Sequence, residues 1–157
     1  FSSVLGCNLG MFYKRRDYTR VVNGRNPIVA HEYLGDSVEG KTVFIADDII
    51  ASGESMLEVA SNLKVRGAKR IIADATFPLF TSGLDKFDKA VEEGTLDYVV
   101  GTNLTYRKPE LLNRDWYVDV DVSKYAAYFI VALNHDMSVS SIIDPIKKIE
   151  ALLASRK

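Results

Sequence analysis

The chain has 157 residues, of which 47% are hydrophobic and 26% charged, and its formal net charge is −1. These values are typical of one globular domain, and they give no basic field that would attract nucleic acid. No apolar run approaches the ~20 residues needed to span a bilayer, so we expect no membrane segment. The single cysteine, Cys7, excludes an internal disulfide and is expected to be a small buried residue of a cytoplasmic protein.

Strand-like and helix-like segments alternate along the chain. The sequence predicts strands over 10–13, 28–34, 42–46, 70–76, 96–101 and 116–120. It predicts helices from about Ser55 to Gly67, over 84–93, over 123–134 and from Asp144 onward. The polar stretch 17–27, with Gly24 and Pro27, is expected to be a loop. This alternation predicts an α/β fold, with a mostly parallel sheet flanked by helices and joined by right-handed crossovers.

Small polar residues mark the expected helix starts. Ser55 followed by Glu58 fits a capping box for the first long helix, with Ser52 as an equally placed alternative cap. The turn 81–83, Thr-Ser-Gly, is expected to cap the next helix. Asp144 precedes a proline, which is typical of the start of the last helix.

Several polar and aromatic residues are expected to be structural. Trp116 and Tyr117 are expected in the core rather than as base-stacking platforms. The tyrosine-rich run 125–128 is a helix face by its spacing, so we expect it to pack or to form a subunit contact. His31 and His135 are isolated from other metal-binding side chains, so neither is expected to be a ligand, and no residue is assigned to a metal.

Two adjacent carboxylates, Asp47 and Asp48, directly follow the apolar strand over 42–46. A turn of small residues, 51–53, then leads into a helix. Small residues let backbone N–H groups approach an anion closely, and a helix N-terminus adds partial positive charge. The carboxylates can accept hydrogen bonds from hydroxyls or lie near a hydrated divalent ion. The pattern fits a binding site for ribose 5-phosphate. The alternative is structural: the two acids and the turn only cap a helix.

This arrangement resembles the ribose-phosphate binding motif of the type I phosphoribosyltransferase family. Within that family, the chain is similar to the C-terminal part of the ribose-phosphate pyrophosphokinases over nearly all 157 residues. Four stretches carry the resemblance: FYKRRD (12–17), GDSVEGKTVFIADDIIASGESM (35–56), PLFTSGLDKFDKA (78–90) and LNHDMSVSSII (133–143). It implies one phosphoribosyltransferase-like domain over 1–157 whose N-terminal portion is missing.

The resemblance also implies an activity and a site. These enzymes move pyrophosphate from ATP to the 1-hydroxyl of ribose 5-phosphate with Mg²⁺, giving phosphoribosyl pyrophosphate and AMP. Asp47 and Asp48 would contact the ribose hydroxyls. Lys14 and Arg16 would stabilise the transferred phosphates, although a basic cluster taken alone is usually a solvated turn. The 5-phosphate would be bound by the 51–55 segment: Ala51, Ser52, Gly53, Glu54 and Ser55. A homo-oligomer in the cytoplasm is implied as well.

The 51–55 segment departs from the usual family pattern of Asp-Thr-small-Gly-Thr. Ala51 replaces the leading acid, and Glu54 replaces a glycine next to the phosphate. If Glu54 points to solvent, the segment still binds through its backbone, whereas an inward Glu54 would repel the phosphate. Since the chain begins with Phe1, we expect a piece of a longer enzyme that does not turn over alone.

Two other functions are compatible with these residues. A nucleobase phosphoribosyltransferase shares the fold and the phosphate-binding segment, but it needs a base-binding hood for which we find no candidate. A catalytically silent homologue that binds ribose phosphate is favoured by Ala51 and Glu54 and disfavoured by the intact acids and basic residues.

Overall fold

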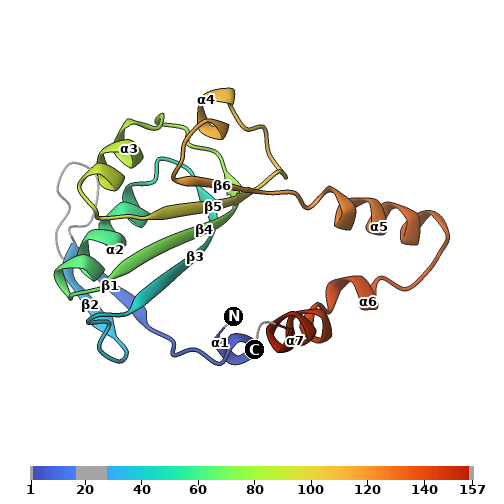
Figure 1. Cartoon of the computed structure of the whole chain (residues 1–157), viewed down its shortest axis with the longest axis horizontal. Coiled ribbons are helices and arrows are strands. Elements are labelled where there is room, and N and C mark those ends of the chain that lie inside the picture. Colours follow the sequence, from blue (N-terminus) through green and yellow to red (C-terminus); the bar gives the residue numbers. More distant parts are fainter. Residues whose placement is uncertain (1, 17–27, 156–157) are drawn as a thin grey trace. The chain divides into compact units, whose positions relative to one another are not determined.

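The computed structural model describes residues 2–16 and 28–155 (Figure 1), so the loop expected over 17–27 lies outside the described residues. The chain divides into two compact units, 1–37 and 38–157, and each is described by itself.

The first unit is a short helix followed by a two-stranded antiparallel sheet. It contains α1 (Ser2–Leu5), β1 (Met11–Arg16) and β2 (Ile28–Leu34). The strand expected over 10–13 therefore continues through the basic cluster, because Lys14 and Arg16 pair with β2 opposite His31 and Ile28. Cys7 is exposed, so the expectation that it is buried is wrong.

The second unit is an α/β unit with a four-stranded sheet, in the order β3-β4-β5-β6 and parallel throughout. The expected fold class is confirmed. The elements are β3 (Thr42–Ile50), α2 (Glu54–Val65), β4 (Arg70–Pro78), α3 (Asp85–Glu92), β5 (Tyr98–Thr102), α4 (Pro109–Leu112), β6 (Tyr117–Val120), α5 (Ser123–Asn134), α6 (Ser140–Ile143) and α7 (Ile146–Ala154).

One face of this sheet carries the core. Alternate residues of the strands are fully buried, with Ile71, Ala73, Ala75 and Val99 at 0% exposure. They pack with apolar residues of α2 and α3, the helices beside the sheet in Figure 1: Met56, Ala60, Leu63, Phe87 and Ala90. Parallel crossovers are right-handed in nearly all proteins, so strands in sequential order place their connections on one face.

The expected helix caps are partly wrong. α2 begins at Glu54 with Gly53 as its N-cap, so Ser55 lies within the first turn and forms no capping box. The hydroxyl of Ser52, the alternative cap, does accept a hydrogen bond from the N–H of Glu54 at 3.5 Å. α3 has no side-chain cap from the turn 81–83, because its N-cap is Leu84. Asp144 does act as expected, since its carboxylate accepts a hydrogen bond from the N–H of Ile146 at 3.1 Å.

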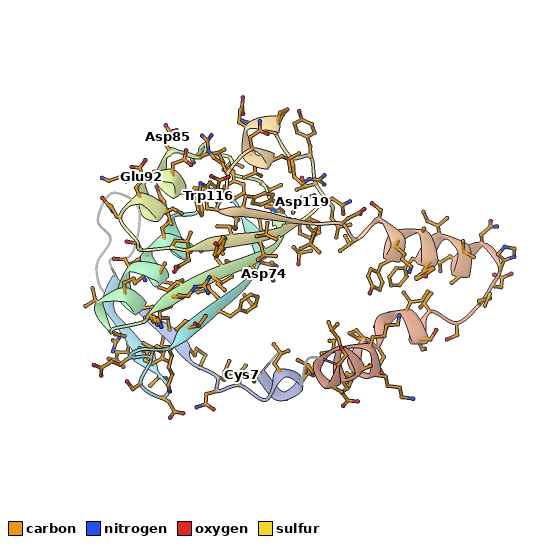
Figure 2. The ribbon with its side chains drawn as sticks, viewed as in Figure 1. Cys7, Asp74, Asp85, Glu92, Trp116 and Asp119 are labelled. Atoms are coloured by element: carbon orange, nitrogen blue, oxygen red, sulfur yellow. The ribbon has the colours of Figure 1, made fainter. Side chains whose placement is uncertain are left out.

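An aromatic cluster joins α3 to β6, as the burial of Trp116 and Tyr117 confirms. The ring of Phe87 stacks on Trp116 at 5.8 Å between centroids. The Trp116 indole N–H (Figure 2) donates to Asp88 Oδ1 at 2.7 Å. Arg114 donates to both oxygens of the same carboxylate, at 2.9 and 2.8 Å. One acid on α3 therefore satisfies two donors of the segment that enters β6.

We expect Asp88→Ala to lower the free energy of unfolding by about 2–5 kcal/mol, because it leaves an arginine and a part-buried indole N–H without their acceptor. Urea denaturation measures the change. The matched control is Asp85→Ala, an acid in the first turn of the same helix (Figure 2) that has no side-chain partner among the described residues. Equal losses in the two variants would assign the effect to the helix terminus and not to Arg114 and Trp116.

Candidate functional site

The two acids lie within β3 and not beyond it. The pairing with β4 continues through Asp47 opposite Ala75, Ile49 opposite Phe77 and Ile50 opposite Pro78, so the strand is longer than its apolar run. Asp47 and Asp48 are both exposed. Because successive side chains of a strand point to opposite faces, the two carboxylates are held apart, which reduces the repulsion expected between neighbouring acids.

A tight turn follows β3 and opens α2. Gly53 has φ 78° and ψ −5°, a left-handed conformation that favours glycine. A side chain at this position would overlap the ring of Phe87, which is fully buried. The turn therefore lies directly on the core. The N–H of Glu54 donates to the Ser52 hydroxyl at 3.5 Å. The N–H of Ser55, also in the first turn of α2, has no acceptor within the helix and can bind an anion.

The loop after β4 braces this turn from the side. The N–H groups of Leu79 and Phe80 both donate to the carbonyl of Ile50, at 2.9 and 3.1 Å. The N–H of Thr81 donates to the carbonyl of Ala51 at 2.9 Å. The carbonyl oxygens of residues 50 and 51 are thus bound to the β4–α3 loop. This arrangement fixes the backbone just ahead of Ser52 and Gly53.

Glu54 is neutralised by a neighbouring helix. Its carboxylate forms an ion pair with Lys86 of α3, with 2.7 Å between Oε1 and Nζ. The side chains are 70% and 51% exposed, respectively, so the pair lies at the surface. Of the two orientations considered for Glu54, the solvent-facing one is the one observed.

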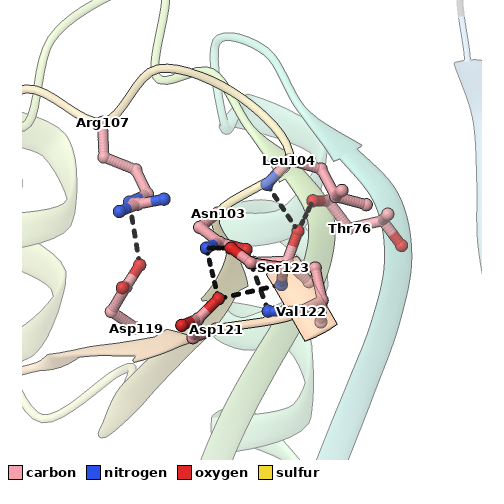
Figure 3. A network of polar contacts seen from close by, with 9 residues as sticks. Thr76, Asn103, Leu104, Arg107, Asp119, Asp121, Val122 and Ser123 are labelled. Atoms are coloured by element: carbon pink, nitrogen blue, oxygen red, sulfur yellow. Dashed lines mark hydrogen bonds and ion pairs between the residues drawn. The ribbon is translucent and has the colours of Figure 1, made fainter. Parts of the chain in front are cut away.

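A polar network connects the carboxyl ends of β4, β5 and β6 (Figure 3). The Thr102 hydroxyl donates to the Thr76 carbonyl at 2.6 Å. The Asn103 amide donates to Asp121 Oδ1 at 2.6 Å and to the Ser123 hydroxyl at 2.8 Å, and its oxygen accepts from the N–H of Val122. Hydrogen bonds from Ser123 and Asn103 lower the pKa of the Asp121 carboxyl.

Sequence reasoning did not predict this network. The Thr102 hydroxyl joins β5 to β4, whereas the Asn103 amide joins the end of β5 to the start of α5. Asp121 and the ion pair between Arg107 Nε and Asp119 Oδ1, at 2.9 Å, were missed. Polar residues after successive parallel strands were the available signal, since such strands end at one edge of the sheet.

A buried tyrosine lies at the start of β6. Burial raises the pKa of Tyr117 to about 12, and the negative charge of Asp119 adds to the rise, whereas Arg107 opposes it. Its hydroxyl has no hydrogen-bond partner among the residues that the structure describes. Tyr117 therefore stays neutral at physiological pH and acts as a core residue.

The site residues divide between the two units. Asp47, Asp48 and the 51–55 segment are contiguous in the second unit, and Glu54 and Ser55 open α2. Lys14 and Arg16 belong to β1 of the first unit, so their role at the phosphates stays a prediction.

Within residues 2–16 and 28–155, no group of three or more His, Cys, Asp or Glu side chains is arranged to hold a metal ion. No helix there is long and apolar enough to cross a membrane.

Together, these features are a parallel α/β sheet, a turn of small residues and a helix N-terminus after β3, an arrangement in which α/β proteins commonly bind phosphate. The family model described as the phosphoribosyl transferase domain matches residues 1–124. The chain therefore belongs to the phosphoribosyl transferase domain family.

Two relatives with curated names are similar to most of this chain. A ribose-phosphate pyrophosphokinase of Shewanella oneidensis is 29% identical over 135 residues, which cover 86% of this chain and 40% of that protein. One of Thermotoga maritima is 31% identical over 140 residues, which cover 88% of this chain and 40% of that protein. This chain thus spans about two fifths of the length of these two relatives.

A solved structure shows the same fold. The phosphoribosylpyrophosphate synthetase from Mycobacterium smegmatis superposes with a TM-score of 0.59 at 22% sequence identity. The match covers 68% of this chain and 34% of that one.

We expect Gly53→Ala to lower the free energy of unfolding by about 2–4 kcal/mol, because the new methyl group both overlaps Phe87 and occupies a left-handed conformation. Thermal and urea unfolding measure the loss. Gly94→Ala is the control, since Gly94 has φ 70° with no atom within 4 Å of an added Cβ, and it should lose only about 1–2 kcal/mol. A similar loss in both variants would mean that the Phe87 ring shifts without cost.

Proposed function

We propose that this chain supplies the ribose 5-phosphate site of a ribose-phosphate pyrophosphokinase. One observation carries the proposal: Asp47 and Asp48 at the end of β3 lead into a core-anchored turn and the N-terminus of α2. The names of the curated relatives support the same activity.

In this proposal, the two ends of the ligand are bound by different chemistry. The 5-phosphate accepts hydrogen bonds from the backbone N–H groups of the 51–55 segment and from the hydroxyls of Ser52 and Ser55. Because Asp47 and Asp48 point to opposite faces of β3, one of the two carboxylates accepts hydrogen bonds from the ribose hydroxyls, and it only accepts when it is ionised. A phosphate and a diol at opposite ends therefore select a sugar phosphate rather than a free phosphate.

The transfer joins the 1-hydroxyl oxygen of the sugar to the β-phosphorus of ATP, and the bond from that phosphorus to the bridging oxygen of AMP breaks. Lys14 and Arg16 are proposed to balance the negative charge of the transferred phosphates, the arginine through two hydrogen bonds and the lysine as a point charge. Mg²⁺ supplies further charge neutralisation when bound. Asp47 and Asp48 fit a hydrated Mg²⁺, which is commonly held by one or two carboxylates and by substrate phosphates.

Two alternatives remain distinct in their chemistry. A nucleobase phosphoribosyltransferase would consume phosphoribosyl pyrophosphate in the presence of a base and would not need ATP. A catalytically silent homologue would bind ribose 5-phosphate without any transfer. The ion pair of Glu54 with Lys86 weakens the case for the silent homologue, because the charge that argued against phosphate binding is neutralised. Assays with ATP and ribose 5-phosphate, and with phosphoribosyl pyrophosphate and a base, separate all three.

We expect ribose 5-phosphate to bind this chain in the presence of Mg²⁺ and the Asp47→Asn/Asp48→Asn variant to bind at least about tenfold more weakly, because amides are poorer acceptors for the sugar hydroxyls. Isothermal titration calorimetry measures both affinities. Asp85→Asn, which removes an exposed acid from α3, should bind as the unaltered chain does. A folded chain that binds no ribose 5-phosphate, or a double variant that binds it unchanged, would overturn the proposed site.

The Glu54–Lys86 ion pair provides a second test. Lys86→Ala should weaken ribose 5-phosphate binding by about two- to fivefold at low salt, because it removes the positive charge that Lys86 places on the Glu54 carboxylate beside the phosphate. Adding Glu54→Gln to that variant should restore the affinity. Lys89→Ala removes another exposed lysine of α3, 3.7 Å from Glu93, and should have no effect. An unchanged affinity of Lys86→Ala would show that Glu54 does not influence the phosphate.

A further inference from the structure

Phe80 has a backbone conformation that is unusual for a bulky residue. It lies in the β4–α3 loop, residues 79–84 (Figure 1), and its φ of 46° is in the left-handed region. A residue with a large side chain is strained there, because its Cβ comes close to the backbone. Such conformations persist only where the surrounding structure enforces them, and they cluster at functional sites. The contacts of Phe80 therefore show what the strain maintains.

The ring of Phe80 holds the strained conformation in place. The residue is only 4% exposed. Its ring meets that of Phe87 edge to face, with 4.9 Å between centroids. The rings of Trp116 and Tyr117 lie 6.0 and 6.3 Å away. Burial among three other aromatic rings therefore offsets the cost of the left-handed backbone.

The backbone of Phe80 sets the direction of two neighbouring N–H groups. Its φ and ψ join the peptide that carries its own N–H to the peptide that carries the N–H of Thr81. The first N–H donates to the carbonyl of Ile50 at 3.1 Å, and the second donates to the carbonyl of Ala51 at 2.9 Å. Left-handed residues within a turn are known to bring successive N–H groups to one side of the chain. Here that side faces the turn after β3.

The same hydrogen bonds orient two donors of the turn. In a trans peptide, the C=O and the N–H point in opposite directions, and no peptide bond of the described residues is cis. Because the carbonyls of Ile50 and Ala51 are directed at the β4–α3 loop, the N–H groups of Ala51 and Ser52 are directed away from it. Ala51 is exposed and Ser52 is half-buried, so a ligand can approach both.

We propose that Phe80 is a positioning residue for the sugar-phosphate site. Its left-handed backbone, held by its buried ring, keeps the β4–α3 loop on the carbonyls of residues 50 and 51. The N–H groups of Ala51 and Ser52 are thereby directed toward the 5-phosphate before the ligand arrives. Phe80 touches no ligand and acts only through the turn. The inference rests on the proposed function, because it concerns the affinity of that same site.

Two substitutions separate the backbone conformation of residue 80 from the packing of its ring. Phe80→Ala and Phe80→Gly both remove the ring, but only glycine adopts a left-handed conformation without strain. We expect Phe80→Ala to bind ribose 5-phosphate about tenfold more weakly than the unaltered chain, and Phe80→Gly to bind at least about threefold more tightly than Phe80→Ala. Isothermal titration calorimetry with Mg²⁺ measures the three affinities. A role in core packing alone predicts equal affinities for the two folded variants, since neither has a ring.

Leu96→Ala is the matched control for lost stability. Leu96 is 1% exposed and directly precedes the amino end of β5, whereas the turn lies at the carboxyl end of β3, the opposite edge of the parallel sheet. Truncation of this buried side chain should destabilise the fold, yet it should leave the affinity for ribose 5-phosphate unchanged. Urea denaturation checks that every variant is folded under the conditions of the titration.

Nuclear magnetic resonance of the unaltered chain tests the same mechanism without a substitution. The N–H of Thr81 should exchange slowly with solvent both before and after ribose 5-phosphate is added, because its bond to Ala51 is already made. The amide resonances of Ala51 and Ser52 should shift when the ligand binds. Rapid exchange at Thr81 in the free chain, or unshifted resonances at residues 51 and 52, would contradict the mechanism.

The titrations distinguish a failure of this inference from a failure of the proposed function. An unaltered chain that binds no ribose 5-phosphate overturns the proposed function and the inference with it. If the unaltered chain binds and Phe80→Ala binds equally well, only the inference is overturned. The same holds if Phe80→Gly binds no more tightly than Phe80→Ala.

Discussion

The candidate site depends on the contact between Gly53 and the ring of Phe87. The glycine conformation brings the turn after β3 close enough to the core that no side chain fits between them. Phe87 in turn stacks on Trp116, whose indole is bound by Asp88. The N-terminus of α2 is therefore positioned by the packing of α3 and β6, which lie far along the chain. Such an anchored backbone can present N–H groups to a phosphate without losing further conformational entropy.

Charge balance explains how the 51–55 segment tolerates an acid. Backbone N–H groups and a helix N-terminus provide only partial charges, so a full negative charge nearby would outweigh them if it were unpaired. Lys86, one helix away, supplies the counter-charge to Glu54 at the surface. Exposed pairs contribute little to stability, about 0.2–1 kcal/mol. We therefore expect this pair to influence the affinity of the proposed phosphate site more than the stability of the fold.

Much of the fold could be predicted from the sequence, because continuous apolar runs and helical spacing are local signals. The helix over 123–134 has the expected bounds, and the parallel sheet is confirmed. The strand end at Asp47 was misjudged, since pairing with β4 carries β3 beyond its apolar residues. The cap of α2 was misjudged because Phe87, which fixes Gly53, is distant in sequence. For the same reason, the partners of Glu54 and Asn103 could not be inferred from local patterns.

The position of the site and the exposure of the sheet have a common topological origin. Strands in the sequential order β3-β4-β5-β6 place every connection on one face, which buries that face and leaves the other open. In open α/β sheets, ligands bind where the connections change from one face to the other. In the described part of the chain, β3 is the edge strand from which such a change would start, and it carries Asp47 and Asp48.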